Sequence, residues 1–246
     1  MSRQTERDPY GGRNPREIPA YTCFDAAHYL RIPEPTIRNW VIGYTYPTNG
    51  GVRRRKTPPL IDIADARGYG LSFVNLLELH VLGALRREHH VRMRKVRSAI
   101  KYLQERLNSC HPLVDHEMVT DGTDIFVDEY GSLINASREG QLAMKALLHA
   151  YLRRMERNER GVAIRLFPFT RARGADNAET VARQPQIVSI DPTVAFGRPV
   201  IAGSRVPTIE VFERFNAGES PDELAEDFHR TSEEIWEAIR CEAAAA

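Results

Sequence analysis

The sequence is poor in cysteine and has no long apolar run. Three cysteines occur in 246 residues, at positions 23, 110 and 241. Because they are odd in number and far apart, they exclude both a disulfide framework and a Cys-x-x-Cys metal knuckle. No apolar run approaches the roughly 18 residues that cross a bilayer, and the N-terminal stretch lacks the apolar core of a signal peptide. We therefore expect reduced thiols, a cytoplasmic location and no membrane partner.

Patterns typical of enzymes are also lacking. The chain has no nucleotide-binding Gly-rich loop and no nucleophile elbow. The histidines at positions 89, 90, 111 and 116 lack the compact spacing of metal ligands. We predict no enzyme, no metal and no cofactor, and keep a metal-dependent hydrolase as the weakest alternative.

An excess of one charge is missing overall, because the formal net charge is +1. The total hides an asymmetry along the chain. Residues 13–56 carry eight basic and three acidic side chains, whereas residues 187–246 carry five and twelve. The basic front and the acidic back should therefore attract different partners.

The N-terminal pattern predicts a helix-turn-helix within a DNA-binding domain at 19–110. Residues 1–18 are polar and rich in Gly, Pro and Arg, which is typical of a disordered tail. A first short helix begins after Thr22, whose partner in a capping box is Asp25, and Pro33 ends it. A second short helix opens at residues 34–36 and closes at Gly43.

The second helix and the following hairpin provide the candidate DNA contacts. Ile37 and Val41 are spaced to face the core, while Trp40 fits either the core or a phosphate contact. A hairpin over residues 44–56, with its turn at Asn49-Gly50-Gly51, would form a basic wing. The candidate contacts are Thr36, Arg38, Asn39, Tyr44, Arg53, Arg54, Arg55 and Lys56. Two short helices and a solvated run of charges are also common in proteins that bind no DNA. The basic run lies just beyond the second helix, and this position favours a DNA-binding wing.

The middle of the chain gives weaker signals. Apolar spacing predicts a buried helix over 72–87 and an amphipathic basic helix over 92–107. Over 111–169 we expect a small strand meander around residues 125–127, then a helix and a short strand. Residues 170–186 lose almost all large apolar side chains and predict a linker.

The last segment, 187–246, predicts a compact domain. A strand at 187–190 and a Gly- and Pro-punctuated hairpin at 197–207 precede three short helices at about 208–217, 221–228 and 232–243. Within the hairpin, Arg198 and Arg205 are candidate partner contacts. Salt bridges to the domain's own carboxylates are the favoured interpretation for both. The acidic last helix would repel phosphate and argues against a second DNA site.

Two resemblances follow from these motifs. Residues 21 to about 107 are similar to the winged-helix DNA-binding region of the MerR type. The run Gly197-x-Pro199-x-Ile201-x-Gly203-Ser204-Arg205-Val206-Pro207 resembles the pattern of a small prokaryotic antitoxin-associated domain, Gly-x-Pro-x-Ile-x-Gly-Thr-Arg-Val-Pro. Together they resemble the large antitoxins of VapBC-type toxin–antitoxin pairs.

We accordingly expect an α+β, mainly α protein with an N-terminal winged helix-turn-helix, a C-terminal small β-hairpin and a trihelical bundle. The resemblance implies a type II antitoxin that binds operator DNA as an autorepressing homodimer and neutralises a PIN-like ribonuclease toxin. The alternative is a stand-alone MerR-like transcription regulator whose C-terminal domain only dimerises.

Overall fold

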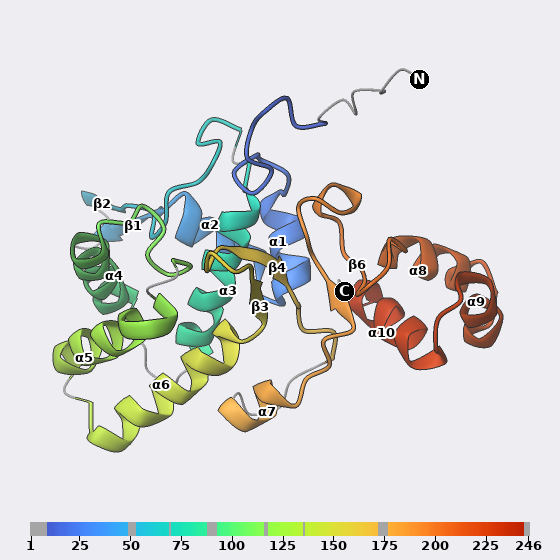
Figure 1. The fold of residues 1–246 in the computed structure, drawn as a ribbon. Helices are drawn as coiled ribbons and strands as arrows, with labels where there is room; N and C mark the ends of the chain where they lie inside the picture. The colour runs from blue at the N-terminus through green and yellow to red at the C-terminus, as the bar shows by residue number, and fades with distance from the viewer. Residues whose placement is uncertain are drawn as a thin grey trace, which may run out of the picture.

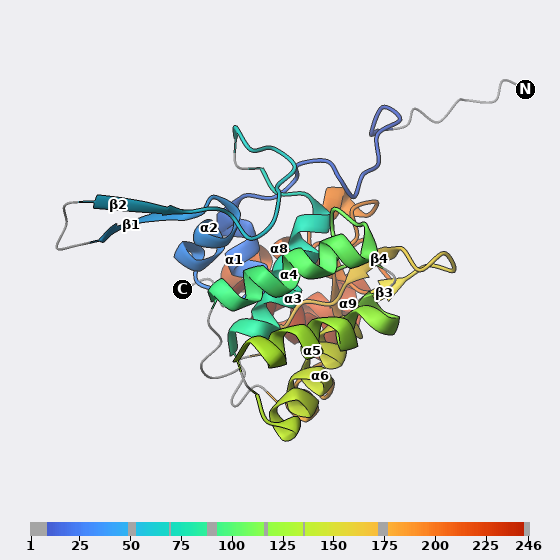
Figure 2. The same cartoon turned by 90° about the vertical axis from the view of Figure 1, so that its left-hand side faces the viewer.

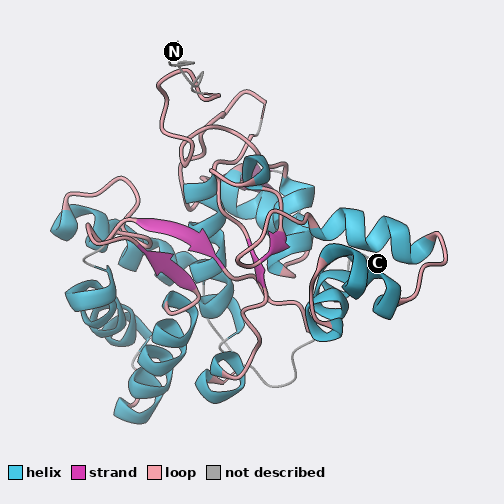
Figure 3. Cartoon of the chain, turned by 45° about the vertical axis from the view of Figure 1, so that its right-hand side comes forward, coloured by secondary structure: helices cyan, strands magenta, loops and turns pink. Residues whose placement is uncertain are grey.

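The computed structural model describes residues 9–48, 53–68, 70–87, 93–115, 118–134, 136–171 and 177–243. The chain is mainly helical, and its described strands form three separate two-stranded antiparallel sheets (Figures 1 and 3). The α+β fold class is therefore confirmed. None of the helices in these ranges is long and apolar enough to span a membrane.

The helix-turn-helix forms as the local signals predict. Its two helices are α1 (Cys23–Leu30) and α2 (Glu34–Val41). Thr22 and Asp25 form the capping box, since the Thr22 Oγ1 accepts from the Asp25 backbone N–H and the Asp25 carboxylate accepts from the Thr22 N–H. Pro35 stands in the first turn of α2, where its missing N–H costs nothing.

The wing follows α2 as an antiparallel hairpin. Its strands are β1 (Tyr44–Thr48) and β2 (Arg53–Thr57), and they project away from the helical body in Figure 2. The predicted hairpin is confirmed, although its turn lies outside the described residues. Pairing runs from Tyr44 opposite Thr57 to Thr48 opposite Arg53.

A helix that is buried over residues 73–85 forms the centre of the larger core. This helix is α3 (Phe73–Arg87), and every residue from 71 to 85 is buried. His80 within it is a core histidine: its Nε2 lies 3.2 Å from the carbonyl of Tyr151, and its ring stacks on Phe169. The amphipathic helix α4 (Met93–Leu107) presents its apolar residues to the core.

The small strand meander expected around residues 125–127 is wrong. A π-helical turn (Met118–Gly122) leads directly into α5 (Thr123–Ile134), so residues 125–127 are helical. Burial at positions 123, 126, 127, 130 and 131 follows the helical period, and Phe126 stacks on Tyr130 one turn later. The burial of this helical face outweighs the turn signals of Gly122 and Gly131.

A second correction concerns the linker at 170–186, of which residues 172–176 lie outside the described ranges. After α6 (Arg138–Leu152), the strands β3 (Met155–Arg157) and β4 (Ala163–Leu166) pair, and the short helix α7 (Ala178–Ala182) packs against α6. Val181 in α7 is fully buried in the larger core. Residues 177–186 are thus part of the folded body rather than a spacer.

The expected disordered tail is also wrong over residues 9–18, while residues 1–8 lie outside the described ranges. The Tyr10 hydroxyl donates to the Pro192 carbonyl at 2.7 Å, and the Val74 N–H donates to the Arg16 carbonyl at 3.1 Å. Contacts to distant residues order this polar segment.

The C-terminal module has a buried core of its own. Strands β5 (Val188–Ser189) and β6 (Val200–Ile201) pair, and the helices α8 (Thr208–Asn216), α9 (Pro221–Phe228) and α10 (Ser232–Ala243) follow. Ile201, Val211, Leu224 and Ile235 are fully buried in a cluster separate from the larger core.

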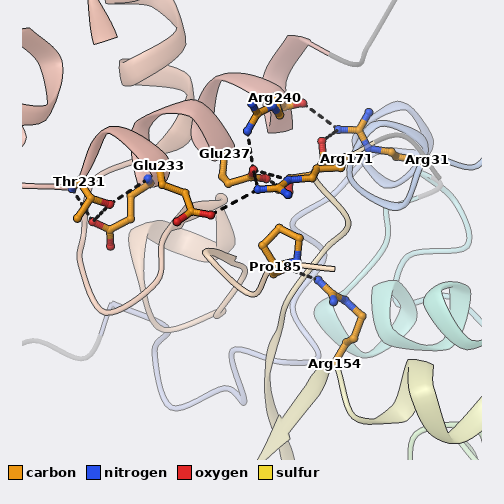
Figure 4. Close-up of polar contacts among 10 residues, drawn as sticks. Arg31, Arg154, Arg171, Pro185, Thr231, Glu233, Glu237 and Arg240 are labelled. Atoms are coloured by element: carbon orange, nitrogen blue, oxygen red, sulfur yellow. Dashed lines mark hydrogen bonds and ion pairs between the residues drawn. The ribbon is translucent and has the colours of Figure 1, made fainter. Parts of the chain in front are cut away.

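Backbone and side-chain hydrogen bonds join the two modules. Leu166 of β4 exchanges two backbone hydrogen bonds with Ile190, at 2.8 and 2.9 Å. Glu237, which is fully buried, accepts hydrogen bonds from Thr170 and Arg171 and pairs with Arg240 (Figure 4). The modules are therefore docked on each other rather than tethered.

Candidate nucleic-acid interface

Helix α2 turns one polar face outward. Ile37, Trp40 and Val41 are buried, which assigns Trp40 to the core. Asn39 is exposed and Thr36 half-buried, and both line a hollow between α2, the wing and α4. These two side chains lie where a helix in a major groove would present them to base edges.

Arg38 lies apart from this hollow. Its Nε donates to the Glu34 carboxylate at 3.1 Å, one helical turn earlier, and both side chains are about half exposed. The structure does not group this predicted contact with Thr36 and Asn39. Such an exposed pair contributes little to stability and leaves the guanidinium accessible.

The alternation of the wing divides its basic run between two faces. Tyr46 is paired with Arg55, and Tyr44 with Thr57, so these residues share the face that lines the hollow. The Tyr44 and Tyr46 rings lie 5.8 Å apart. By strand alternation, Arg54 and Lys56 belong to the opposite face, although Lys56 also borders the hollow. Of Arg53 the structure describes the backbone pairing alone.

Three close contacts hold the base of the wing against α2 and α4. Gly43 has a φ of +80°, and a Cβ there would overlap the carbonyl oxygen of Thr57. The Leu60 N–H donates to the Trp40 carbonyl at 2.6 Å. From α4, the Arg97 guanidinium donates to the Pro59 carbonyl, and burial lowers the pKa of Arg97. The hinge of the wing is thus held by both neighbouring helices.

The resulting hollow has a volume of about 570 Å³ and a strongly cationic lining. Arg55 and Lys56 of the wing meet Arg94 and Arg97 of α4, and none of the described residues that line the hollow is a carboxylate. Residue-level sequence reasoning missed Tyr46, Arg94 and Arg97. The signals were present, as an aromatic residue two positions after Tyr44 and a basic helix beyond the wing. Four cations in one concave surface suit a polyanion.

Arg198 and Arg205 are exposed, and the expected salt bridges to the module's carboxylates are wrong. Neither guanidinium has a hydrogen bond or ion pair among the described residues. The carboxylates pair elsewhere: Glu219 and Asp227 with Arg214, and Glu234 with Arg230. Both predicted partner contacts therefore remain accessible to a second molecule.

Comparisons with known proteins agree with this arrangement. Residues 19–100 match the family model described as "Putative DNA-binding HTH domain", which confirms the predicted helix-turn-helix, and residues 188–240 match "Protein of unknown function (DUF433)". Two Mycobacterium tuberculosis proteins are similar over 91% of this chain: "Putative antitoxin VapB45", 26% identical over 93% of its length, and "Uncharacterized protein Rv2308", 24% identical over 89%. The crystal structure of Rv2018 from the same organism covers 91% of this chain and 98% of its own, with a TM-score of 0.61 and 22% identity. The chain therefore shares its fold with a solved protein and carries a helix-turn-helix of the DNA-binding type.

Proposed function

We propose that this chain binds operator DNA through its helix-turn-helix and wing, and that it is the antitoxin of a type II toxin–antitoxin pair. The observation that carries the DNA half is the hollow formed by α2, the wing and α4, whose described lining contains four cations and no carboxylate. Thr36 and Asn39 would face base edges, while Arg55, Lys56 and Arg94 would neutralise phosphates. Binding as a homodimer would place two such surfaces on a two-fold operator.

The number of cations gives the expected salt dependence. Each phosphate neutralised contributes about 0.9 to the slope of log K against log salt. A homodimer with three to four cations in each of its two hollows would neutralise roughly six to eight phosphates. Its affinity for DNA should then fall roughly 10³- to 10⁵-fold between about 50 and 200 mM salt. A weaker dependence would mean that the hollow does not contain the phosphate backbone.

Fluorescence anisotropy with a labelled duplex from the chain's own promoter tests the DNA half. Arg55→Ala and Arg94→Ala should each lower the salt slope by about 0.9 for every phosphate that is no longer neutralised, on promoter and scrambled duplexes alike. Asn39→Ala should mainly reduce the preference for the promoter, by roughly 1–3 kcal/mol. Arg183→Ala is the control, because Arg183 is an exposed, paired arginine that caps the C-terminus of the remote α7. Unchanged slopes in both arginine variants would reject this interface.

The antitoxin half rests on the C-terminal module. Its match to a family model over residues 188–240 and the similarity of the chain to a protein named as an antitoxin support it. The predicted partner is a PIN-like ribonuclease toxin encoded by a neighbouring gene. Arg198 and Arg205 are proposed contacts, since their charges are exposed and unpaired in the described structure. The same comparisons support a regulator rather than an enzyme.

Co-purification separates this proposal from its alternative. The tagged full-length chain should capture the product of the neighbouring gene and suppress its ribonuclease activity. Arg198→Ala together with Arg205→Ala should weaken the capture, whereas Arg183→Ala should not. DNA binding without any capture would instead favour the stand-alone regulator, whose C-terminal module only dimerises.

A further inference from the structure

A turn of the C-terminal module with strained backbone carries an exposed phenylalanine, Phe196. Ala195 and Phe196 both adopt left-handed backbone conformations, with φ of +47° and +55°. The Phe196 side chain is 72% exposed. Left-handed backbone costs a residue with a Cβ roughly 1–2 kcal/mol, and such strain is concentrated at functional positions. The turn thus holds an apolar side chain in water at a conformational cost.

Neighbouring contacts hold this turn in place. The buried Tyr21 hydroxyl donates to the Gly197 carbonyl at 2.9 Å, and a Cβ at Gly197 would overlap that hydroxyl. On the other side, the Asp191 carboxylate accepts from both the backbone N–H and the hydroxyl of Thr193. The exposure of Phe196 is therefore built into the junction between the modules.

Phe196 forms one wall of a groove of about 250 Å³. The opposite side comes from the N-terminal segment, where Tyr10 packs edge-to-face against Phe196 with ring centroids 6.4 Å apart. Ile18 and Pro192 add apolar lining, and Arg13 adds a charge. In the part of the chain that the structure describes, no carboxylate lines the groove. Its volume suits one or two apolar side chains rather than a folded domain.

The charges around the groove indicate its occupant. Arg13 in the lining and Arg198, two residues after Phe196, are exposed, and neither guanidinium is paired among the described residues. We infer that this groove binds an extended acidic segment of a partner protein, in which apolar side chains alternate with carboxylates. The inference rests on the partner half of the proposed function and identifies the face that the partner contacts.

A peptide titration tests the groove directly. The probe is a short acetylated and amidated peptide of alternating leucine and glutamate, added to full-length ¹⁵N-labelled protein. It should shift the backbone amides of Tyr10, Phe196 and Arg198, with a dissociation constant on the order of millimolar, as expected for one buried side chain and exposed ion pairs. Peptides with lysine for glutamate, or serine for leucine, should produce no comparable shifts.

Phe196→Gly distinguishes a functional side chain from a structural one. Glycine relieves the left-handed strain, so the variant should melt roughly 2–4 °C higher than the parent while binding the peptide at least threefold more weakly. Arg198→Ala should also weaken binding at least threefold, and Arg183→Ala should not. A lower melting temperature would assign Phe196 to the core of the fold and overturn the inference.

Other outcomes are equally decisive. Equal binding of the acidic and lysine peptides, or shifts away from the groove, would overturn the inference. Loss of a dimer in Phe196→Gly during sedimentation would show that a second copy fills the groove. If Phe196→Gly and Arg198→Ala both capture the neighbouring gene product as strongly as the parent protein, the groove is not the contact face, but the proposed function stands. If the parent protein captures nothing, the proposed toxin partner itself is rejected.

Discussion

Replacing Arg154 by methionine should remove a large fraction of the stability of the fold. Arg154 is only 2% exposed, so its cation lies inside the folded body. Its guanidinium donates to four backbone carbonyls at 2.8–3.1 Å, and its central carbon lies 4.4 Å from the ring centroid of Phe169. The acceptors belong to Phe167, Pro168, Gln184 and Pro185. One arginine thus joins two segments that are separated by the whole of α7.

The magnitude follows from what methionine would leave behind. Hydrogen bonds to a charged group contribute about 1.5–3 kcal/mol each, but the desolvation of the buried cation offsets much of their sum. Methionine keeps the length of the side chain but supplies no donor to these four carbonyls. We expect a loss of about 3–5 kcal/mol, compared with a total stability of roughly 5–15 kcal/mol for an ordinary domain. Arg154→Lys should lose about half as much, because an ammonium has three donors and cannot reproduce the planar fork.

Urea unfolding followed by circular dichroism measures this loss. Arg153→Met is the matched control, because Arg153 is the adjacent residue and its side chain is exposed. That control should stay within about 0.5 kcal/mol of the parent. A loss under about 1 kcal/mol in Arg154→Met, or an equal loss in the control, would refute the argument that these four carbonyls depend on the buried guanidinium.

Three further predictions concern the wing and a buried carboxylate. Gly43→Ala should weaken DNA binding and lower the free energy of unfolding by about 2 kcal/mol, because φ is positive there and the added Cβ would overlap backbone. The control is Gly203→Ala, where φ is +72° but the Cβ would meet open space. It should cost about 1 kcal/mol and leave DNA binding unchanged in fluorescence anisotropy. Arg97→Met should weaken promoter binding because it removes the hydrogen bond to the Pro59 carbonyl, and Arg97→Lys should weaken it less. Equal binding by the parent and both variants would contradict a role for Arg97 in holding the wing. Burial raises the pKa of Glu78. The Glu78 carboxylate lies 3.2 Å from the Nδ1 of His111 and raises the pKa of His111 above 6.5. The folded protein therefore retains protons that the unfolded chain releases. Stability contributed by this pair should therefore be present at acidic pH and decline as pH rises through the folded pKa of His111. Glu78→Gln removes the buried carboxylate and the cause of the raised pKa of His111, so it should flatten that decline in urea titrations at about pH 5.5 and 8.

Elements with local signals could be predicted from the sequence. The capping box at Thr22 was readable because donor and acceptor lie three residues apart. The wing was readable from its turn residues and its basic strand. These features depend on interactions within a few positions of the chain, and the structure reproduces each of them in the residues it describes.

The errors lie where distant contacts decide the outcome. Residues 177–186 contain few large apolar side chains, yet Val181 is buried and the carbonyls of Gln184 and Pro185 meet Arg154. Nothing near these positions in the sequence indicates an arginine that lies about thirty residues earlier. The same holds for Tyr10 and its acceptor Pro192. A polar, loop-like composition therefore predicted disorder where long-range hydrogen bonds produce order.

The candidate site was predictable by element but not by face. Of the predicted DNA contacts, Thr36, Asn39, Tyr44, Arg55 and Lys56 line the hollow, whereas Arg38 pairs with Glu34 outside it. The alternation of side chains along a strand is enough to assign Arg54 and Arg55 to opposite faces of the wing. The contribution of Arg94 could not be predicted in this way, because it depends on where α4 packs. Packing between helices far apart in sequence creates that concave surface, and no local pattern encodes it.

The docking of the modules changes how their two proposed activities can be related. Arg31 ends α1 in a left-handed conformation, and its guanidinium donates to the carbonyls of Phe169, Thr170 and Arg240 at 2.8–2.9 Å. Figure 4 shows this residue beside the buried Glu237 cluster, so the first helix of the helix-turn-helix is bonded directly to the last helix of the chain. With no flexible spacer between them in the described structure, a partner bound to the C-terminal module would be held at a fixed position relative to the DNA surface. Its effect on operator binding would then depend on geometry and shared contacts, and not on the effective concentration set by a tether.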